Sequence, residues 1–445
     1  MKRKELLIVI CVIAFGIIYN AVESGDFEIR FYEGCSISPR SLQDRKYPND
    51  FAREELQYSY ANIKKIEIHN TAGGIVVEKS TDNEDGIRVK PLVRVYHRSK
   101  EKAAKIEKTI KIVTRTSKAN KKISLSIQPG EGFPYRRVRV HFKLVVPEGI
   151  ELDLWNRYGD IDIDGCGKNI SLDEKHGDIS VKQAETNIKI RHGHGNVALR
   201  DINGRIELSS KHSRIGIKNA GELKLHFSHA RVSINRVEKK TDIDYAAHSS
   251  IEMEDGNGFA LEGRHTKIKL KKINGGVNIK NSHSAITLED ITGNVNIKAR
   301  HCKIFLDQVI SDSVILKNAY AYIGIEGITA KTLDILTSHG SLDIAFDQVE
   351  ERINIKNKHS RISLEYPPSV KPLFNINSKY GTIIDKTSVK YTILKEKNRM
   401  SLNNPEGKPE IIINNPYGTT VLKNSREEPK KPKMEKVETE EFRQL

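Results

Sequence analysis

The sequence predicts an all-β protein whose main part is a β-solenoid with coils of about 18 residues. Three observations predict this fold. An aromatic or His residue recurs every 17 to 21 residues between residues 158 and 380. Each interval holds two short strands in which aliphatic and polar residues alternate, and turn residues separate these strands. Hydrophobic residues make up only 37% of the chain, which suits a thin core shared between neighbouring coils.

The recurring residue defines one position per coil. Its last interval, of 37 residues, is about two periods long, and with Pro367, Pro368 and Pro372 nearby it predicts an excursion or a C-terminal cap. The position is occupied by Tyr158, His176, His194, His212, His229, His248, His265, His283, His301, Tyr320, His339, His359, Tyr380 and Tyr417. Strands of successive coils lie ~4.8 Å apart, so flat rings at one corner are expected to stack as a ladder along about fourteen coils.

We interpret this ring ladder as structural, because a flat ring rather than an ionisable group is common to all its members. Two alternatives stay open. A pH sensor is one, because adjacent imidazoles that gain protons repel one another. Metal binding is the other, although a single column of His lacks the carboxylate or Cys partners of a specific site. No cofactor is expected.

The N-terminus has the composition of a signal peptide or an uncleaved signal anchor. Lys2, Arg3 and Lys4 precede an apolar run, Leu6–Val22, and positive residues on that side predict an N-terminus in the cytoplasm. We expect a single-pass anchor within residues 1–24 that inserts into the cell membrane. The solenoid would then be extracytoplasmic, either periplasmic or at the cell surface, and cleavage with secretion is the alternative.

The rest of the chain divides by composition. Residues 25–57 show no sustained period and are expected to be a spacer. Residues 58–155 are rich in strand patterns and should form an N-terminal cap, with one amphipathic helix at about residues 99–113 where apolar residues are three and four apart. The solenoid repeats occupy residues 156–424. Residues 425–445 contain Lys, Glu and Pro with few aliphatics, which is typical of disorder.

The chain is basic, with 74 Lys and Arg against 58 Asp and Glu and a formal charge of +16. Such a surface attracts polyanions. Lys280, Lys298 and Lys356 each follow an outward Asn by two residues and predict a basic strip on one face. The strip is either a track for an anionic envelope polymer or surface glycan, or a solvated strand face that keeps the protein soluble. Nucleic acid is not an expected partner.

Catalytic signals are weak. Asp160 and Asp178 fall on adjacent coils, but Asn196 follows in the next coil, so no calcium column continues. As a carboxylate pair for glycoside cleavage they are outweighed by their interpretation as solvated surface groups. No phosphate-binding loop, dinucleotide fingerprint or nucleophile elbow is present in the sequence. We therefore expect no enzyme and assign no catalytic, cofactor or metal residues.

Several motifs together resemble a known family. They are Asn70, Gly73 and Gly74 in the N-terminal strands, the run Val145–Gly149 before the array, and the repeated Tyr/His, Gly, Asp, Ile units. Over about Ile63–Leu422 the chain is similar to the bacterial "putative adhesin" domain of unknown function, also described as β-strand-repeat proteins. The resemblance implies a membrane-attached or exported β-solenoid of the cell envelope without established catalytic residues. The chain departs from the family in replacing Gly after the ring residue by Ser, Ala or Thr in most coils.

The sequence thus predicts an anchored, exported β-solenoid that acts as a non-catalytic binding or structural element of the bacterial cell envelope. The main alternative is a membrane-associated scaffold that self-associates end to end through unpaired terminal coils. A more distant alternative is an enzyme that acts on envelope polysaccharide.

Overall fold

The structure is a computed structural model of the chain. It describes residues 47–59, 63–80, 86–119, 121–128, 137–396, 399–403 and 407–425. The expected anchor at residues 1–24 lies outside these ranges, as does all but the first residue of the expected disordered tail. Within the described ranges, no helix combines the length and the apolar composition that crossing a membrane requires.

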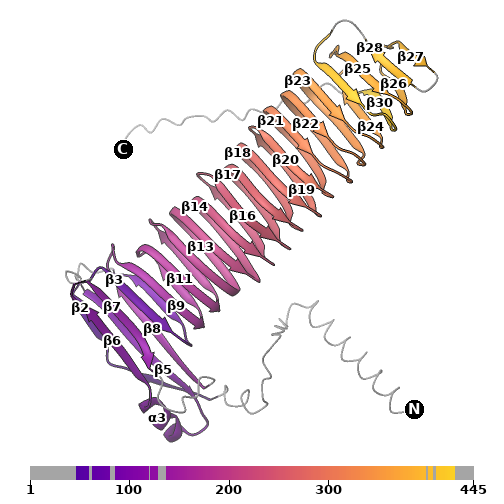
Figure 1. Cartoon of the computed structure of the whole chain (residues 1–445). Helices are drawn as coiled ribbons and strands as arrows, with labels where there is room; N and C mark the ends of the chain where they lie inside the picture. Colours follow the sequence, from indigo (N-terminus) through magenta and orange to yellow (C-terminus); the bar gives the residue numbers. More distant parts are fainter. Residues whose placement is uncertain are drawn as a thin grey trace, which may run out of the picture.

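The described chain forms one long stack of coils, which confirms the predicted β-solenoid (Figure 1). Each coil has two strands, one on each side of a thin core. On the side named face A here, β10 (Ile161–Asp164) pairs in parallel with β12 (Ile179–Ala184). On the opposite side, face B, β9 (Glu151–Tyr158) pairs in parallel with β11 (Lys168–His176). Successive coils therefore hydrogen-bond on both faces.

The core is a set of aliphatic columns that run along the stack. Ile161 lies opposite Ile179, which lies opposite Val197, and Ile215 continues the same column. These four side chains are at most 1% exposed. Burying a side chain of this kind contributes about 1.5–3 kcal/mol. Because alternate residues point to opposite sides of a strand, the polar residues between them face water.

In the middle of the stack most strands are long because one strand passes through a corner and contributes to two faces. For example, β18 pairs with β19 through Ile268 and with β20 through Val277. The elements are β13 (Ile188–Lys211), β14 (Ser213–Ser228), β15 (Arg231–Val237), β16 (Thr241–Ala247), β17 (Ser250–Arg264), β18 (Lys267–Ser282), β19 (Ala285–Thr292), β20 (Val295–Arg300), β21 (Lys303–Lys317), β22 (Ile323–Leu336) and β23 (Leu342–Lys356).

In eight successive coils the corner after the face A strand is turned by a non-Gly residue in the left-handed region. These residues have φ between 53° and 64°, and each precedes a buried residue that re-enters the core. They are Gln183, Asp201, Asn219, Arg236, Asp255, Lys272, Asp290 and Gln308. Sequence reasoning missed this column, although its Asn and Asp members are residue types that tolerate such φ values.

The N-terminal cap contains a coil that lies out of sequence order. Its strands are β3 (Lys65–Asn70) and β4 (Ile75–Lys79). β3 pairs with both β7 (Lys122–Gln128) and β9, and β4 pairs with both β8 (Val138–Val146) and β10. The first coil in the sequence is therefore enclosed between two coils that follow it in the chain.

The outer surface of the cap is made by antiparallel strands. β5 (Gly86–Tyr96) pairs with β8, and β6 (Lys111–Ser117) pairs with β7. β1 (Pro48–Ala52) and β2 (Leu56–Ser59) both pair antiparallel with β5. The predicted spacer at residues 25–57 is therefore wrong for its C-terminal part, which belongs to the cap.

The single described helix, α3 (Lys100–Lys108), is shorter than the predicted range of residues 99–113. Ser99 Oγ caps it by accepting a hydrogen bond from Lys102 N at 3.3 Å, and its buried Ala103 faces the cap, where α3 lies beside β5 (Figure 1). The helix ends at Lys108 because Ile112 and Val113, which are β-branched, belong to β6 and pair with β7.

The C-terminal end also contains a coil out of order. β29 (Glu410–Asn414) pairs with both β23 and β25 (Leu373–Ser378). β30 (Thr419–Asn424) likewise pairs with both β24 (Ile362–Tyr366) and β26 (Thr382–Lys386). The last coil of the sequence is thus inserted between its two predecessors. The 37-residue interval, where the sequence predicted an excursion or a C-terminal cap, thus contains a return of the chain rather than two successive coils.

The segment between these coils covers the end of face B. β28 (Arg399–Asn403) pairs antiparallel with β25, and β27 (Ile393–Glu396) pairs antiparallel with β28 (Figure 1). Antiparallel strands change the direction of the ladder, so the parallel stack stops here.

Candidate functional site

The structure brings all fourteen predicted rings into one column, at the corner where each face B strand leads into a face A strand. Neighbouring ring centroids are 4.8–5.3 Å apart and their planes differ by 3–21°. The order differs from the sequence at one place, because Tyr417 stacks between His359 and Tyr380. Tyr320 has a ring on each side and is still 51% exposed, so the rings cover each other's faces and present their outer edges to solvent.

Two kinds of backbone turn carry these rings. In the first, Gly follows the ring residue, as after Tyr158 and His176. Gly159 has φ +141°, and a Cβ there would lie 2.3 Å from the carbonyl oxygen of Gly73 on the adjacent coil. A Cβ at Gly177 would lie 2.2 Å from the Gly159 carbonyl oxygen. Only Gly lets the backbones of adjacent coils approach this closely.

In the second kind of turn, the ring residue itself is left-handed and a small residue follows. Its φ is 48–65° at His212, His229, His248, His265, His283, His301 and Tyr320, which precede Ser, Ala, Thr or Cys. His is several-fold enriched among non-Gly residues with positive φ. The departure from the family's Gly thus has a physical reason, and the preference for His has a conformational one. His359 is an exception, since it precedes Ser360 but is not left-handed.

An inner column of mostly polar side chains lies beneath the rings, two residues before them, and its apolar members are Phe227, Ala246, Gly263 and Ala299. Asn156 Nδ2 donates to the carbonyl oxygens of Gly73 at 3.0 Å and Gly159 at 2.7 Å. Asn281 and Asn318 donate in the same way, each at 2.7 Å, to corner carbonyls of neighbouring coils. These amides satisfy carbonyl groups at the turn. Sequence reasoning missed this column, whose signal was the recurring Asn two residues before a ring.

One His and two Ser residues of the corner region form a closed hydrogen-bonded cluster, and a buried acid lies beside them on the adjacent coil. His192 Nδ1 lies 2.9 Å from Ser213 Oγ, and Ser210 Oγ donates to Ser213 Oγ at 2.6 Å. His192 Nε2 lies 2.8 Å from the Gly177 carbonyl oxygen and must donate to it, since a carbonyl only accepts. Burial lowers the pKa of His192, which keeps this imidazole neutral.

The acid beside this cluster is Glu174, which lies opposite His192 on the adjacent coil. Burial raises the pKa of Glu174 to about 8, so its carboxyl is protonated at neutral pH. Its Oε1 accepts from His176 N at 2.8 Å. The side chains of the cluster are at most 6% exposed. A substrate cannot reach them, so the resemblance to an acid, base and nucleophile set carries no catalytic meaning.

The two surface carboxylates considered for catalysis bind the backbone of the next coil. Asp160 Oδ1 accepts from Asp178 N at 2.9 Å, and Asp178 Oδ1 accepts from Asn196 N at 2.8 Å. Asn196 Nδ2 also donates to Asp178 Oδ2 at 3.0 Å. These contacts assign both carboxylates a structural part. In the portion of the chain that the structure describes, no group of three His, Cys, Asp or Glu side chains is placed to hold a metal ion.

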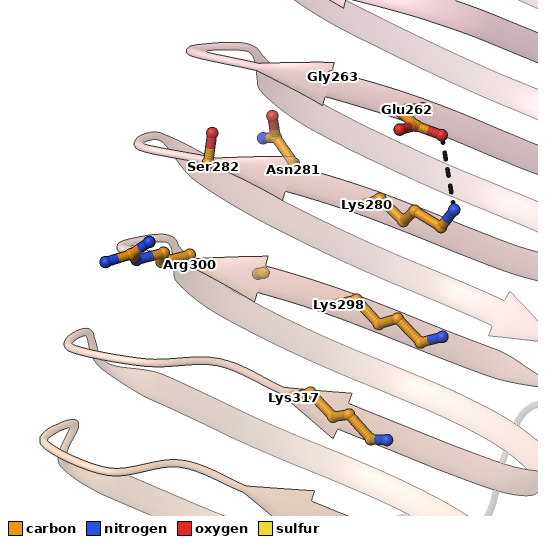
Figure 2. Close-up of a pocket in the computed structure, with 9 residues that line it drawn as sticks. Glu262, Gly263, Lys280, Asn281, Ser282, Lys298, Arg300 and Lys317 are labelled. Carbon is orange, nitrogen blue, oxygen red and sulfur yellow. Dashed lines mark ion pairs between the residues drawn. The ribbon is translucent and has the colours of Figure 1, made fainter.

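Two of the three lysines of the predicted basic strip belong to a row of adjacent lysines on face B. Lys280, Lys298 and Lys317 lie opposite one another on three successive coils of face B (Figure 2). Lys356 lies in the same column of face B, where Leu336, which is 49% exposed, separates it from Lys317. Lys317 was missed because Ile315 stands where the Asn of the pattern was expected.

The three lysines, called the Lys row below, border a shallow groove of about 420 Å³. Arg300 lines the same groove from the end of β20, next to the ring corner (Figure 2). Lys280 Nζ lies 3.5 Å from Glu262. Among the described residues, no carboxylate lies within ion-pair distance of Lys298 or Lys317, which leaves two cations of the row uncompensated.

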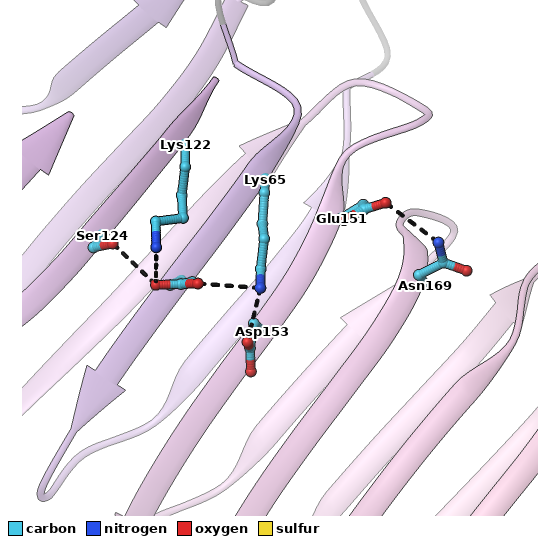
Figure 3. A network of polar contacts seen from close by, with 7 residues as sticks. Lys65, Lys122, Ser124, Glu151, Asp153 and Asn169 are labelled. Atoms are coloured by element: carbon cyan, nitrogen blue, oxygen red, sulfur yellow. Dashed lines mark hydrogen bonds and ion pairs between the residues drawn. The ribbon is translucent and has the colours of Figure 1, made fainter. Parts of the chain in front are cut away.

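A second polar surface joins the enclosed N-terminal coil to both neighbours (Figure 3). Glu67 of β3 accepts from Ser124 and pairs with Lys122 of β7 at 3.0 Å. Lys65 pairs with Glu67 at 3.1 Å and with Asp153 of β9 at 3.0 Å. Burial opposes ionisation of Glu67, but the hydrogen bonds from both lysines and Ser124 outweigh it and lower its pKa to about 2. All these charges have partners, so the network is structural rather than a free binding surface.

Solved structures share low identity with the chain. A "putative cell adhesion protein" from Clostridium sporogenes is 10% identical over 85% of this chain and 100% of its own, with a TM-score of 0.18. A "putative adhesin" from Parabacteroides merdae is 9% identical over 67% and 96%, with a TM-score of 0.22. A "putative lipid binding protein" from Parabacteroides distasonis is 12% identical over 85% and 97%, with a TM-score of 0.17. TM-scores of this size carry no argument, and no curated protein matches the chain.

A protein family matches far more directly. The family described as Toastrack DUF4097 covers residues 63–422, which include both out-of-order coils, the ring column and the Lys row. The match confirms the resemblance drawn from the strand motifs, over the same residues. The chain therefore belongs to the Toastrack DUF4097 family.

Proposed function

We propose that this protein is a non-catalytic binding rod of the bacterial cell envelope that contacts a linear anionic polymer through the Lys row. The observation that carries the proposal is the placement of Lys280, Lys298 and Lys317 on three successive coils, two of them without a carboxylate partner among the described residues. A rigid stack holds these cations one coil apart before a ligand arrives. Little ordering entropy is therefore lost on binding.

The groove beside the Lys row supports binding rather than catalysis. Its lining contains Lys, Arg, Asn and Ser side chains and a single carboxylate, Glu262, which Lys280 already engages. No pair of groups there is arranged as acid and base. The one set with that composition, around His192, is closed to solvent.

Membrane attachment remains a proposal from the sequence. The apolar run Leu6–Val22 after three basic residues supports an N-terminal anchor with the rod outside the cytoplasm. Under this proposal the rod projects from the membrane, and the Lys row is presented to the polymers of the envelope.

The test compares two triple variants of the full-length protein that carry the same change in charge. One is Lys280→Gln, Lys298→Gln, Lys317→Gln. The control is Lys182→Gln, Arg200→Gln, Lys218→Gln, which removes three exposed cations from successive coils of face A. Binding to inorganic polyphosphate and to a polyuronate is measured at several salt concentrations, with neutral dextran as the negative control.

We expect the Lys row variant to weaken binding about tenfold or more and to reduce the salt slope by roughly 2, because each phosphate contact contributes about 0.7 to that slope. The face A variant should keep most of the affinity. Equal losses in the two variants would show that net charge alone, rather than the Lys row, attracts the polymer. Binding to dextran with similar affinity would also contradict the proposal.

A further inference from the structure

Four ring residues have a basic residue immediately before them and another two positions after. The four segments are Lys211-His212-Ser213-Arg214, Arg264-His265-Thr266-Lys267, Arg300-His301-Cys302-Lys303 and Lys358-His359-Ser360-Arg361. All eight flanking cations are exposed. This pattern, called the basic quartets below, is readable in the sequence but is separate from the Lys row.

The fold places the two cations of a quartet on either side of its ring. In the first three quartets the first cation ends a face B strand, where its side chain points outward, and the second lies at the start of a face A strand in the same orientation. In the fourth, Lys358 follows β23 and Arg361 precedes β24. The small residue between them points inward, as Thr266 and Cys302 do at 0% exposure. The outer ring edge therefore lies between two cations at the corner.

These cations lack negative partners. None of the eight has a carboxylate within ion-pair distance in the described part of the chain, and Arg264 donates only to the Tyr245 hydroxyl, at 3.3 Å. From His194 to the end of the column, neither the position before a ring nor the second position after it holds Asp or Glu. Nearby face B carboxylates are already engaged, Glu262 by Lys280 and Asp244 by His226. The corner from His212 to His359 is thus a ridge of uncompensated positive charge.

We propose that this ridge is a second binding site for a linear polyanion, which lies along the rod axis, and that its affinity rises in mild acid as the ring column takes up protons. The ligand class is that of the proposed function, but the residues are different. Rings repeat at 4.8–5.2 Å between His212 and His359, so a small anion meets one quartet whereas a chain of anions meets several.

The groups that face the rings explain the dependence on pH. Above and below each His of the column lies another ring, and at four of them the outward neighbours are the quartet cations. The ionisable groups beneath the column, Glu174 and His192, lie at its N-terminal end, where Asp160 and Asp178 also flank the corner. Burial and then the adjacent imidazoles lower the pKa of His212 and His248. A bound polyanion supplies the missing negative charge, so protonation and binding reinforce each other.

The test uses the full-length protein and inorganic polyphosphate at constant ionic strength, at about pH 8 and about pH 5.5, on either side of the ordinary imidazole pKa. Polyphosphate carries nearly the same charge at both values, so a change in affinity reports on the protein. We expect the Kd to fall about tenfold or more at the lower pH. A polyuronate in a parallel experiment distinguishes phosphate from carboxylate recognition.

Two triple variants locate the effect. His212→Tyr, His265→Tyr, His301→Tyr keeps a ring at each place, as Tyr320 does with φ 65°, but removes the imidazoles within three of the quartets. It should bind as the wild type does at pH 8 and gain less than about threefold at pH 5.5. The control, His248→Tyr, His283→Tyr, His339→Tyr, changes rings without flanking cations and should keep most of the gain. Thermal unfolding checks that both variants keep the wild-type fold.

An affinity that does not change with pH in the wild type would overturn the inference, and so would an equal loss of the gain in both His variants. Neither result affects the Lys row. Conversely, the Lys row variant should lose affinity at both pH values and still bind about tenfold tighter in acid. If the Lys row variant kept its affinity and that affinity still rose in acid, the proposed function would be contradicted, whereas the inference about the ridge would still hold.

Discussion

At the scale of single residues, backbone conformation and packing determine the choice of amino acid at the ring corner. His265 has φ 53°, whereas His194 is followed by a Gly that makes the turn with φ +137°. One column of rings is therefore built from two backbone solutions. The identity of the residue after the ring tells which solution a coil uses, except at His359.

The Gly turns give a direct prediction. Gly159→Ala should destabilise the protein by about 1–3 kcal/mol, because its Cβ would overlap the Gly73 carbonyl oxygen and the residue would be held at a φ that L-residues avoid. The control is Gly216→Ala, where a Cβ meets nothing within 4 Å and no positive φ is required. The guanidinium unfolding midpoint should fall for the first variant and stay or rise slightly for the second. Equal effects would show that the close approach is not strained.

Glu174 gives a second residue-scale prediction, on pH. Its pKa is about 8 in the folded protein and close to 4.5 when unfolded, so the folded state holds the proton more tightly. Stability contributed by this group is full below about pH 4.5 and is lost as the pH rises through 8. Glu174→Gln should therefore raise stability by about 3–5 kcal/mol at pH 9. It should change little near pH 4.

The measurement is the unfolding midpoint of both proteins between about pH 4 and pH 9. Since the two proteins differ only at residue 174, the difference between the two curves isolates Glu174. A difference in midpoint that does not change with pH would contradict the prediction. It would mean that the Glu174 carboxyl is ionised or solvent-exposed in the folded protein.

At the scale of elements, the coil formed by β29 and β30 closes the C-terminal end. It pairs on one side with β23 and β24 and on the other with β25 and β26. Ending the chain before residue 407 should therefore detach the coil of β25 and β26 as well, although that coil stays in the sequence. Hydrogen exchange and limited proteolysis should show lost protection at residues 373–386. Ending the chain after residue 425, beyond these pairings, should leave protection unchanged.

Protection that persists in the shorter chain would show that β25 can pair directly with β23. Such a result would mean that the inserted coil adds length to the stack without holding its end.

Much of the fold could be predicted from the sequence because a short repeat sets local and neighbouring contacts together. The aliphatic alternation at Ile161 and Ile163 fixes which side is buried, and the 18-residue spacing to Ile179 fixes the register. The out-of-order coils could not be predicted. β3 and β29 have the same alternation as any other strand, and nothing in Lys65–Asn70 or Glu410–Asn414 indicates which coils enclose them.

The candidate binding surface was predicted less well than the fold. A pattern with Asn two residues before Lys identified Lys280, Lys298 and the more distant Lys356 but omitted Lys317, because outward residues of different coils vary independently. The inner Asn residues and the basic quartets recur in the sequence at fixed positions around the ring residue. Their roles could not be predicted, because the sequence alone does not show that the residue two before the ring points inward whereas the residue just before it points outward.

At the scale of the whole molecule, both ends of the parallel stack are partly covered. β5 and β6 lie antiparallel at the N-terminal end, and β28 with β27 does so on face B at the C-terminal end. A covered end offers no parallel ladder for another copy to extend. Equivalent positions of successive coils recur along the sides of the rod, and the Lys row and the ridge lie on these sides.

The enclosed coils also decide how the molecule responds to tension. An ordinary solenoid pulled by its tip peels one turn at a time, because the outermost turn is held on one side only. Here a pull from the C-terminus loads β30 first, and β30 can leave only by breaking its ladders with β24 and β26 together. A pull from the N-terminus, after β1 and β2 detach from β5, meets β3 clamped between β7 and β9. At each end of the rod, unfolding under tension therefore requires the two ladders on either side of one strand to break together.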